Sequence, residues 1–137
     1  MATTIETVIT FWFETVSPQQ WWKTDLTLDE TIKSQFGQLH QQAIAGELFL
    51  WRQSPEGRLA EIIILDQFSR NLYRGNAKAF ASDPMALVLA QEAVRPQIDQ
   101  ALPLVQRAFI YMPYMHSESL VIHEQALRLL CPSGEYE

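Results

Sequence analysis

The segment SPEGRLAEIIILDQFSRNLYRG, residues 54–75, decides the fold of this chain of 137 residues. It opens with Ser54 and Pro55 followed by an acidic residue, which is the pattern of a helix start. Serine caps free backbone amides, proline suits the first helical position, and an acid suits the positive end of the helix dipole. The apolar run 62–65 would also suit a buried strand, but it follows this start and continues at helical spacing. We therefore expect a central helix that begins at Ser54.

Asp66 falls on the face of this helix that must be buried. An ionised carboxylate among isoleucines is costly unless it has a partner, and Arg70 lies one turn further along the same face. Two interpretations stay open. In the first, Asp66 and Arg70 form a structural ion pair that ties the helix end to its neighbours. In the second, the floor of a cleft that binds a carboxylate or phosphate is formed by Arg70, Asn71, Tyr73 and Arg74.

A second polar cluster lies at residues 116–118, which read HSE. His116 or Ser117 is a suitable cap for a final helix, with Glu118 in its first turn. Alternatively, His116 and Glu118 bind a ligand across the cleft from Arg70 or Arg107. A catalytic pair of His116 and Ser117 is disfavoured because adjacent helical residues point in different directions, so we assign no catalytic residue.

The rest of the chain also has a helical period. Capping boxes at Thr3 and Thr27 and a cap followed by proline at Asp83 mark further helix starts, and Gly46 is placed to end the second helix. A shorter helix is expected over 102–111, before Pro113, and a last one over 117–130. We predict an all-α fold of antiparallel helical hairpins with about six helices, in one domain over 1–137 with an ordered core over about 3–131.

Composition excludes several partners. Ten basic against 16 acidic residues give a net charge of −6, which opposes nucleic-acid binding. No apolar run is long enough to span a membrane. The single cysteine, Cys131, permits no internal disulfide or cysteine metal cluster, which favours a cytoplasmic location. His123-Glu124 lacks the second histidine of a zinc-protease motif, and His40 is expected at the surface or half-buried, so we expect no metal and no cofactor.

Two adjacent tryptophans, Trp21 and Trp22, precede the second predicted helix. Both cannot face the same side of a helix, so one of them is a candidate for a ligand or partner surface. Packing of this segment against the core is the favoured interpretation, because buried tryptophan strongly stabilises a small domain.

Several short blocks, in order, resemble the bacterial domain-of-unknown-function family numbered 924. They are Phe11-Trp12-Phe13, the segments 22–25 and 46–51, Asp66-Gln67-Phe68, Arg70-Asn71, Tyr73-Arg74-Gly75, Ala79-Phe80-Ala81 with Asp83, and Pro113 with His116-Ser117-Glu118. The resemblance implies an all-α fold similar to tetratricopeptide-like domains, and it implies no reaction.

The chain departs from this family in two ways. Ser69 stands where the family usually has proline, and family members generally continue with another helix pair and a second block that carries Arg and Asn. This chain is therefore short at its C-terminus, stopping soon after Leu130. A face that those helices would cover is expected to be exposed, or buried by a second copy of the chain, so we expect self-association.

The favoured function is that of a helical binding module which holds a peptide or a small anionic ligand in a polar cleft. The predicted ligand-binding residues are Arg70, Asn71, Tyr73, Arg74, Arg107, His116 and Glu118. One alternative is a hydrolase-type enzyme that uses His116 with Asp66 or Glu118 as general acid and base. The other is a purely structural protein with a buried ion-pair network.

Overall fold

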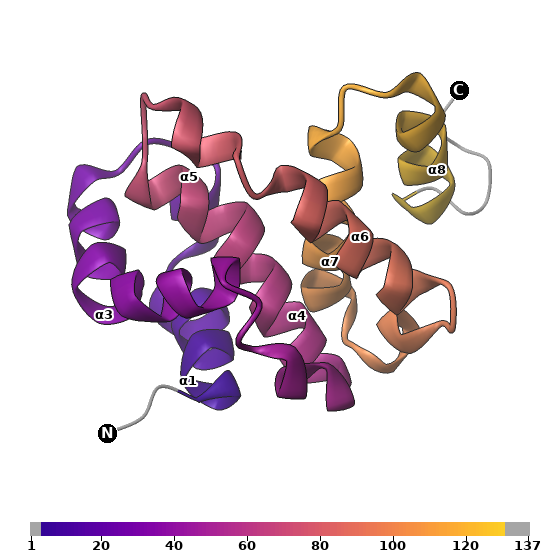
Figure 1. Cartoon of the computed structure of the whole chain (residues 1–137), viewed down its shortest axis with the longest axis horizontal. Helices are drawn as coiled ribbons and strands as arrows, with labels where there is room; N and C mark the ends of the chain where they lie inside the picture. The colour runs from indigo at the N-terminus through magenta and orange to yellow at the C-terminus, as the bar shows by residue number, and fades with distance from the viewer. Residues whose placement is uncertain (1–3, 131–137) are drawn as a thin grey trace.

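The computed structural model describes residues 4–130, and every regular element in that range is helical (Figure 1). This confirms the predicted all-α class. Thr3 and Cys131, the predicted limits of the ordered core, lie outside the described residues. The α-helices are α1 Ile5–Thr10, α2 Pro18–Trp21, α3 Leu26–Ile44, α4 Pro55–Ile63, α5 Ser69–Leu72, α6 Asp83–Val94, α7 Leu104–His116 and α8 Leu120–Leu130. Short 3-10 or π segments are η1 Phe11–Thr15, η2 Phe49–Gln53, η3 Ile64–Phe68, η4 Ala77–Phe80 and η5 Ile98–Ala101.

The central rod of the fold consists of α4, η3 and α5, which follow one another without a break. Ser54 caps it as expected, because its Oγ accepts the backbone amide of Gly57 at 3.0 Å. The apolar run 62–65 is helical and fully buried, so it is not a strand. Its π-helical part η3 widens the turn at Asp66, and such π-turns often occur at functional sites.

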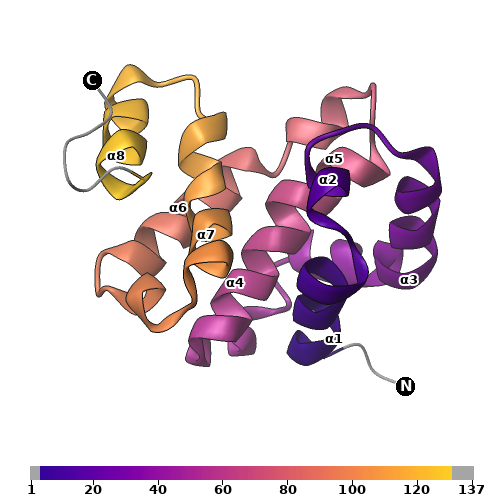
Figure 2. The ribbon, with the colours of Figure 1, turned by 180° about the vertical axis from the view of Figure 1, so that it is seen from behind.

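The other helices flank this rod on two sides. In both views α1 and α3 lie on one side of it and α6, α7 and α8 on the other (Figures 1 and 2). Helix α3 packs on α5 and η3, α1 packs on α4, and α6 and α7 form a hairpin that also contacts α4. A single apolar cluster extends from Val8 to Ala126. In the described part of the chain, no helix combines the length and the apolar character needed to cross a membrane.

Several helix ends differ from the prediction. The cap of α1 is Thr4. Helix α3 begins two residues earlier than predicted, because its cap is Asp25 rather than Thr27, and Asp25 accepts the amide of Leu28 at 3.0 Å. A sequence offers several capping residues within a few positions, and the local pattern does not choose among them. Gly46 ends α3 as predicted, with the positive φ of 76° that glycine adopts at low cost.

The end of α7 matters most for the site. The helix was expected to stop before Pro113, but it includes this residue and runs on to His116. Pro113 costs only one hydrogen bond in the last turn, and it is buried against the core. His116 therefore ends α7 instead of capping α8, and Ser117 is the C-cap of α7.

His40 is buried, contrary to the expected surface or half-buried position. Only 2% of it is exposed, and its Nε2 lies 2.7 Å from Ser69 Oγ, so the pair joins α3 to α5. Burial lowers the pKa of His40, which favours the neutral ring. His40 is thus part of the core, and it lies outside the cavities that His116 lines.

Candidate functional site

Asp66 is the buried centre of the site. It is 1% exposed, and the turn of η3 directs it between α5 and the end of α7. Its Oδ1 lies 2.8 Å from His116 Nδ1, and its Oδ2 accepts a hydrogen bond from Gln67 Nε2 at 2.9 Å. Because an ionised carboxylate only accepts, His116 Nδ1 carries the hydrogen of this contact. The fold thus joins two residues that are 50 positions apart in sequence.

Arg70 joins three parts of the chain. Its Nη1 donates to the backbone oxygen of Asp66 at 2.7 Å and lies 3.4 Å from the Asp66 carboxylate. Its stronger partner is Asp83, which accepts two bonds from the guanidinium at 3.0 Å each. The guanidinium also lies over the Phe80 ring, 5.3 Å from its centre. The predicted contact with Asp66 is present, but the bidentate pair with Asp83 fixes Arg70.

Arg74 and Asn71 are held in a similar way by Asp29 of α3. Arg74 donates to Asp29 from Nε at 2.7 Å and from Nη2 at 3.0 Å, and Asn71 Nδ2 donates at 2.9 Å. Burial raises the pKa of Asp29, but these bonds and the charge of Arg74 lower it by more, so that the pKa lies below its ordinary value. The same contact raises the pKa of Arg74. Both groups therefore stay charged at neutral pH.

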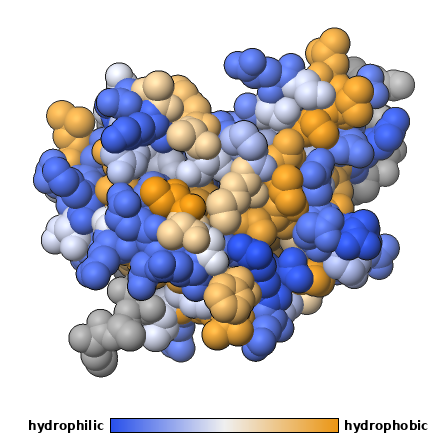
Figure 3. All heavy atoms as spheres, in the orientation of Figure 1, coloured by the Kyte–Doolittle hydropathy of each residue, from blue (hydrophilic) through white to orange (hydrophobic). Residues whose placement is uncertain are grey.

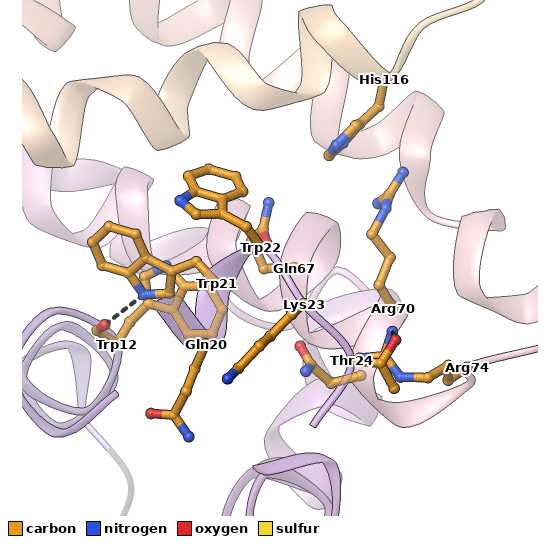
Figure 4. A pocket seen from close by; sticks show the side chains of 11 residues that line it. Trp12, Gln20, Trp21, Trp22, Lys23, Thr24, Gln67, Arg70, Arg74 and His116 are labelled. Carbon is orange, nitrogen blue, oxygen red and sulfur yellow. Dashed lines mark hydrogen bonds between the residues drawn. The ribbon is translucent and has the colours of Figure 1, made fainter. Parts of the chain in front are cut away.

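A cavity of about 280 Å³ opens beside these residues (Figure 4). In Figure 4, Trp21 and Trp22 lie on one side of it, and His116, Arg70 and Arg74 lie on the other. Trp21 is fixed by a hydrogen bond from its Nε1 to the backbone oxygen of Trp12 at 3.0 Å. The lining contains no aspartate or glutamate; it consists of Trp12, Gln20, Trp21, Trp22, Lys23, Thr24, Gln67, Arg70, Asn71, Arg74 and His116.

A second cavity of about 370 Å³ shares His116 with the first. It lies between η4, the start of α6 and the loop after α7. Glu118 lines this second cavity rather than the first. Its full lining is Phe80, Asp83, Pro84, Leu87, Pro113, His116, Ser117 and Glu118.

Two predicted ligand-binding residues lie elsewhere. Tyr73 turns toward α3, where its hydroxyl accepts a bond from Gln41 Nε2 at 3.4 Å and its ring packs near His40. Arg107 lies near the start of α7 and donates to the backbone oxygen of Leu102 at 3.0 Å. Nine helical residues, about 13 Å of rise, separate it from His116, so it does not reach the cleft. The structure brings the other five predicted residues together: Arg70, Asn71, Arg74 and His116 line the first cavity, and Glu118 lines the second.

Sequence reasoning missed Asp29, Asp83 and Lys23. Asp29 lies three residues before the buried Ile32 on the same helix face, and such spacing is the signal that identified Asp66. Asp83 was interpreted as a helix cap, whereas it is the first residue of α6 and pairs with Arg70. No local pattern marks Lys23. Within residues 4–130, no three His, Cys, Asp or Glu side chains are grouped to hold a metal ion.

Comparison with known proteins gives a family and no activity. None of the curated proteins matches the chain. A solved structure described as a protein of unknown function, ATU0120 from Agrobacterium tumefaciens, is similar with 35% identity and a TM-score of 0.89. The similarity covers 95% of this chain and 73% of that one. The model of a family described as bacterial protein of unknown function (DUF924) matches residues 8–135, and the chain therefore belongs to the DUF924 family.

Proposed function

We propose that this protein is a helical binding module whose first cavity, the one beside Trp21 and Trp22, holds a small anionic ligand. The observation that supports this most directly is the charge of the lining. Lys23, Arg70 and Arg74 line the cavity without any carboxylate, in a chain whose net charge is −6. Such a cavity attracts anions, and guanidinium groups match carboxylate and phosphate oxygens in shape.

The three aspartates behind the cavity support the same role. Asp29, Asp66 and Asp83 do not line it, and they hold the two arginines in fixed positions. Arg70 Nε has no acceptor among residues 4–130, and Arg74 Nη1 has only a long contact of 3.4 Å to Thr24. Donors that are already oriented bind an anion at a lower entropic cost.

The shape of the cavity limits the ligand. Its volume of about 280 Å³ lies near the lower end of the range for small-molecule sites, about 300–1,000 Å³. The indole of Trp22 is 64% exposed and stacks on Phe109, so it offers an apolar surface beside the donors. The ligand is accordingly a small organic anion or the acidic end of a short peptide.

Calorimetric titration with citrate, pyrophosphate and N-acetylglutamate tests the proposal. We expect at least one of them to bind, and Lys23→Gln to weaken that binding about tenfold, since hydrogen bonds to charged groups contribute roughly 1.5–3 kcal/mol. Lys33→Gln is the matched control, because Lys33 is equally exposed but lies outside the cavity. If Arg70→Ala lowered stability and left binding unchanged, the purely structural ion-pair network would be the better explanation.

A hydrolase is the second candidate, because of the contact between Asp66 and His116. A buried carboxylate on Nδ1 orients the ring and leaves Nε2 as a general base at the wall of both cavities. Ser69 is held by His40, so water is the nucleophile in this hypothesis. Release of nitrophenol from p-nitrophenyl acetate or phosphate, abolished by His116→Gln at unchanged melting temperature, supports it. Equal rates for both proteins refute it for these substrates.

We also propose a cytoplasmic location. Its support is the single cysteine, because a chain with one cysteine forms no internal disulfide, the bond that small proteins of oxidising compartments commonly use. Fractionation of cells that express the full chain tests this, and recovery outside the cytoplasm would contradict it.

A further inference from the structure

The second cavity has the opposite charge to the first. Asp83 and Glu118 line it without any lysine or arginine, whereas three basic side chains and no carboxylate line the first. The two cavities lie on either side of His116, which lines both. In the space-filling view the outline is notched between the part formed by α5 and the part formed by α8 (Figure 3). A ligand long enough to occupy both cavities would therefore have basic side chains at one end and acidic side chains at the other.

The charges that are free to meet a ligand lie in different cavities. Arg70 and Asp83 neutralise each other in their bidentate pair. Lys23 and Glu118 are both exposed, and neither has an ion-pair partner among the described residues. One cation is thus available in the first cavity and one anion in the second.

From this arrangement we propose that the ligand is a short peptide which carries an acidic group at one end and a basic side chain about two residues before it. The acidic group lies in the first cavity, and the basic group lies beside Glu118 in the second. Phe80, Pro84 and Leu87 offer an apolar wall for the methylene stem of a lysine or arginine. The inference rests on the proposed function, since it keeps the anion site in the first cavity.

A peptide suits the two cavities better than other small anions do, because Lys23 calls for a negative group and Glu118 for a positive one. A dicarboxylate or a phosphate ester satisfies Lys23 and leaves Glu118 without a counter-charge. A peptide backbone also supplies carbonyl oxygens that can accept from Arg70 Nε, and amide N–H groups that can donate to His116 Nε2, which is left as an acceptor by the contact of Nδ1 with Asp66. Arg70 Nε donates to no other described residue, so this donor is available.

The test compares two N-acetylated tripeptides by calorimetric titration: lysyl-alanyl-glutamate, and glutaminyl-alanyl-glutamate, which keeps both carboxylates and replaces the lysine by an uncharged side chain. We expect the lysyl peptide to bind about fivefold more tightly, as one partly exposed ion pair contributes up to about 1 kcal/mol. Glu118→Gln should remove this difference, and Glu124→Gln, an equally exposed glutamate outside both cavities, should preserve it. Lys23→Gln should weaken both peptides by the same factor.

The outcomes separate this inference from the proposed function. Equal affinity for the two peptides, or a preference that survives Glu118→Gln, overturns the assignment of the second cavity while the anion site stands. Binding of neither peptide, together with failure of citrate, pyrophosphate and N-acetylglutamate to bind, overturns both. Glu118 is exposed and makes no described hydrogen bond, so the variant is expected to fold, and its melting temperature checks this.

Discussion

Replacing Arg70 by methionine is the sharpest test of how the ion-pair network contributes to stability. Methionine keeps most of the side-chain stem and removes the guanidinium, which is 22% exposed. The change leaves two carboxylates without their cation. Asp66 is 1% exposed, whereas 23% of the Asp83 side chain is accessible and can be hydrated. Loss of the guanidinium should therefore cost more free energy at Asp66 than at Asp83.

The expected cost follows from this difference. Removing one partner of a buried ion pair costs about 3–5 kcal/mol. Asp66 keeps hydrogen bonds from Gln67 and His116 at 2.9 and 2.8 Å, which places its share at about 3 kcal/mol, the lower end of that range. Loss of the accessible pair with Asp83 adds less than about 1 kcal/mol. We expect Arg70→Met to lower the free energy of unfolding by about 3–4 kcal/mol.

Urea unfolding, followed by the fluorescence of the four tryptophans, measures this cost. The double variant Asp66→Asn with Arg70→Met removes the buried charge as well. It should be more stable than the sum of the two single changes predicts, by about 1–3 kcal/mol. Asp83→Asn is the control and should cost under about 1 kcal/mol. A cost below about 1 kcal/mol for Arg70→Met, or strict additivity in the cycle, would refute the reasoning.

Three further predictions concern other parts of the molecule. The lowered pKa of Asp29 stabilises the fold above about pH 4, the ordinary value, and this contribution is lost as the pH falls through the folded pKa. Asp29→Asn should therefore lower the urea midpoint more at pH 7 than at pH 3, and an equal effect at both would contradict the assignment. Gly57→Ala should destabilise by about 1–3 kcal/mol or more, because the added Cβ would overlap the backbone oxygen of Trp51. Gly37→Ala, which meets no atom within 4 Å, is the control and should not destabilise in thermal melts. Self-association remains a prediction: Leu120 and Val121 are 79% and 67% exposed on α8, so the mass measured by sedimentation should rise with concentration, and Leu120→Glu should restore the monomer. A 15.8 kDa species at every concentration would refute it.

The sequence predicts what depends on near neighbours in the chain. The cap at Ser54, the helix through 62–65 and the burial of Asp66 all follow from residues that are close in the same stretch of sequence. The need of Asp66 for a partner was also predictable, since a buried carboxylate must be compensated. These local arguments were enough to predict the fold class and the position of Asp66 in the site.

The partners of those residues were not predictable in the same way. His116 reaches Asp66 only because α7 continues through Pro113, and that continuation depends on packing that the sequence does not show. The spacing of Arg70 and Asp66 is ideal for a local pair, yet Asp83 offers the better geometry from 13 positions away. A residue with several possible partners takes the one that tertiary packing presents.

The donors left over in the network are the feature on which the proposed binding site depends. A buried ion pair is no more stabilising than apolar packing of the same volume, so stability alone gives little reason to build one. The Arg70 side chain is 22% exposed, and Arg70 Nε is not among the buried atoms that lack a partner, so water can satisfy this donor until a ligand replaces it. Here Asp29 and Asp83 fix two guanidinium groups, while Arg70 Nε remains without an acceptor among the described residues, beside the exposed ammonium of Lys23. Fixed cations with spare donors around one cavity are the arrangement that an anionic ligand would complete.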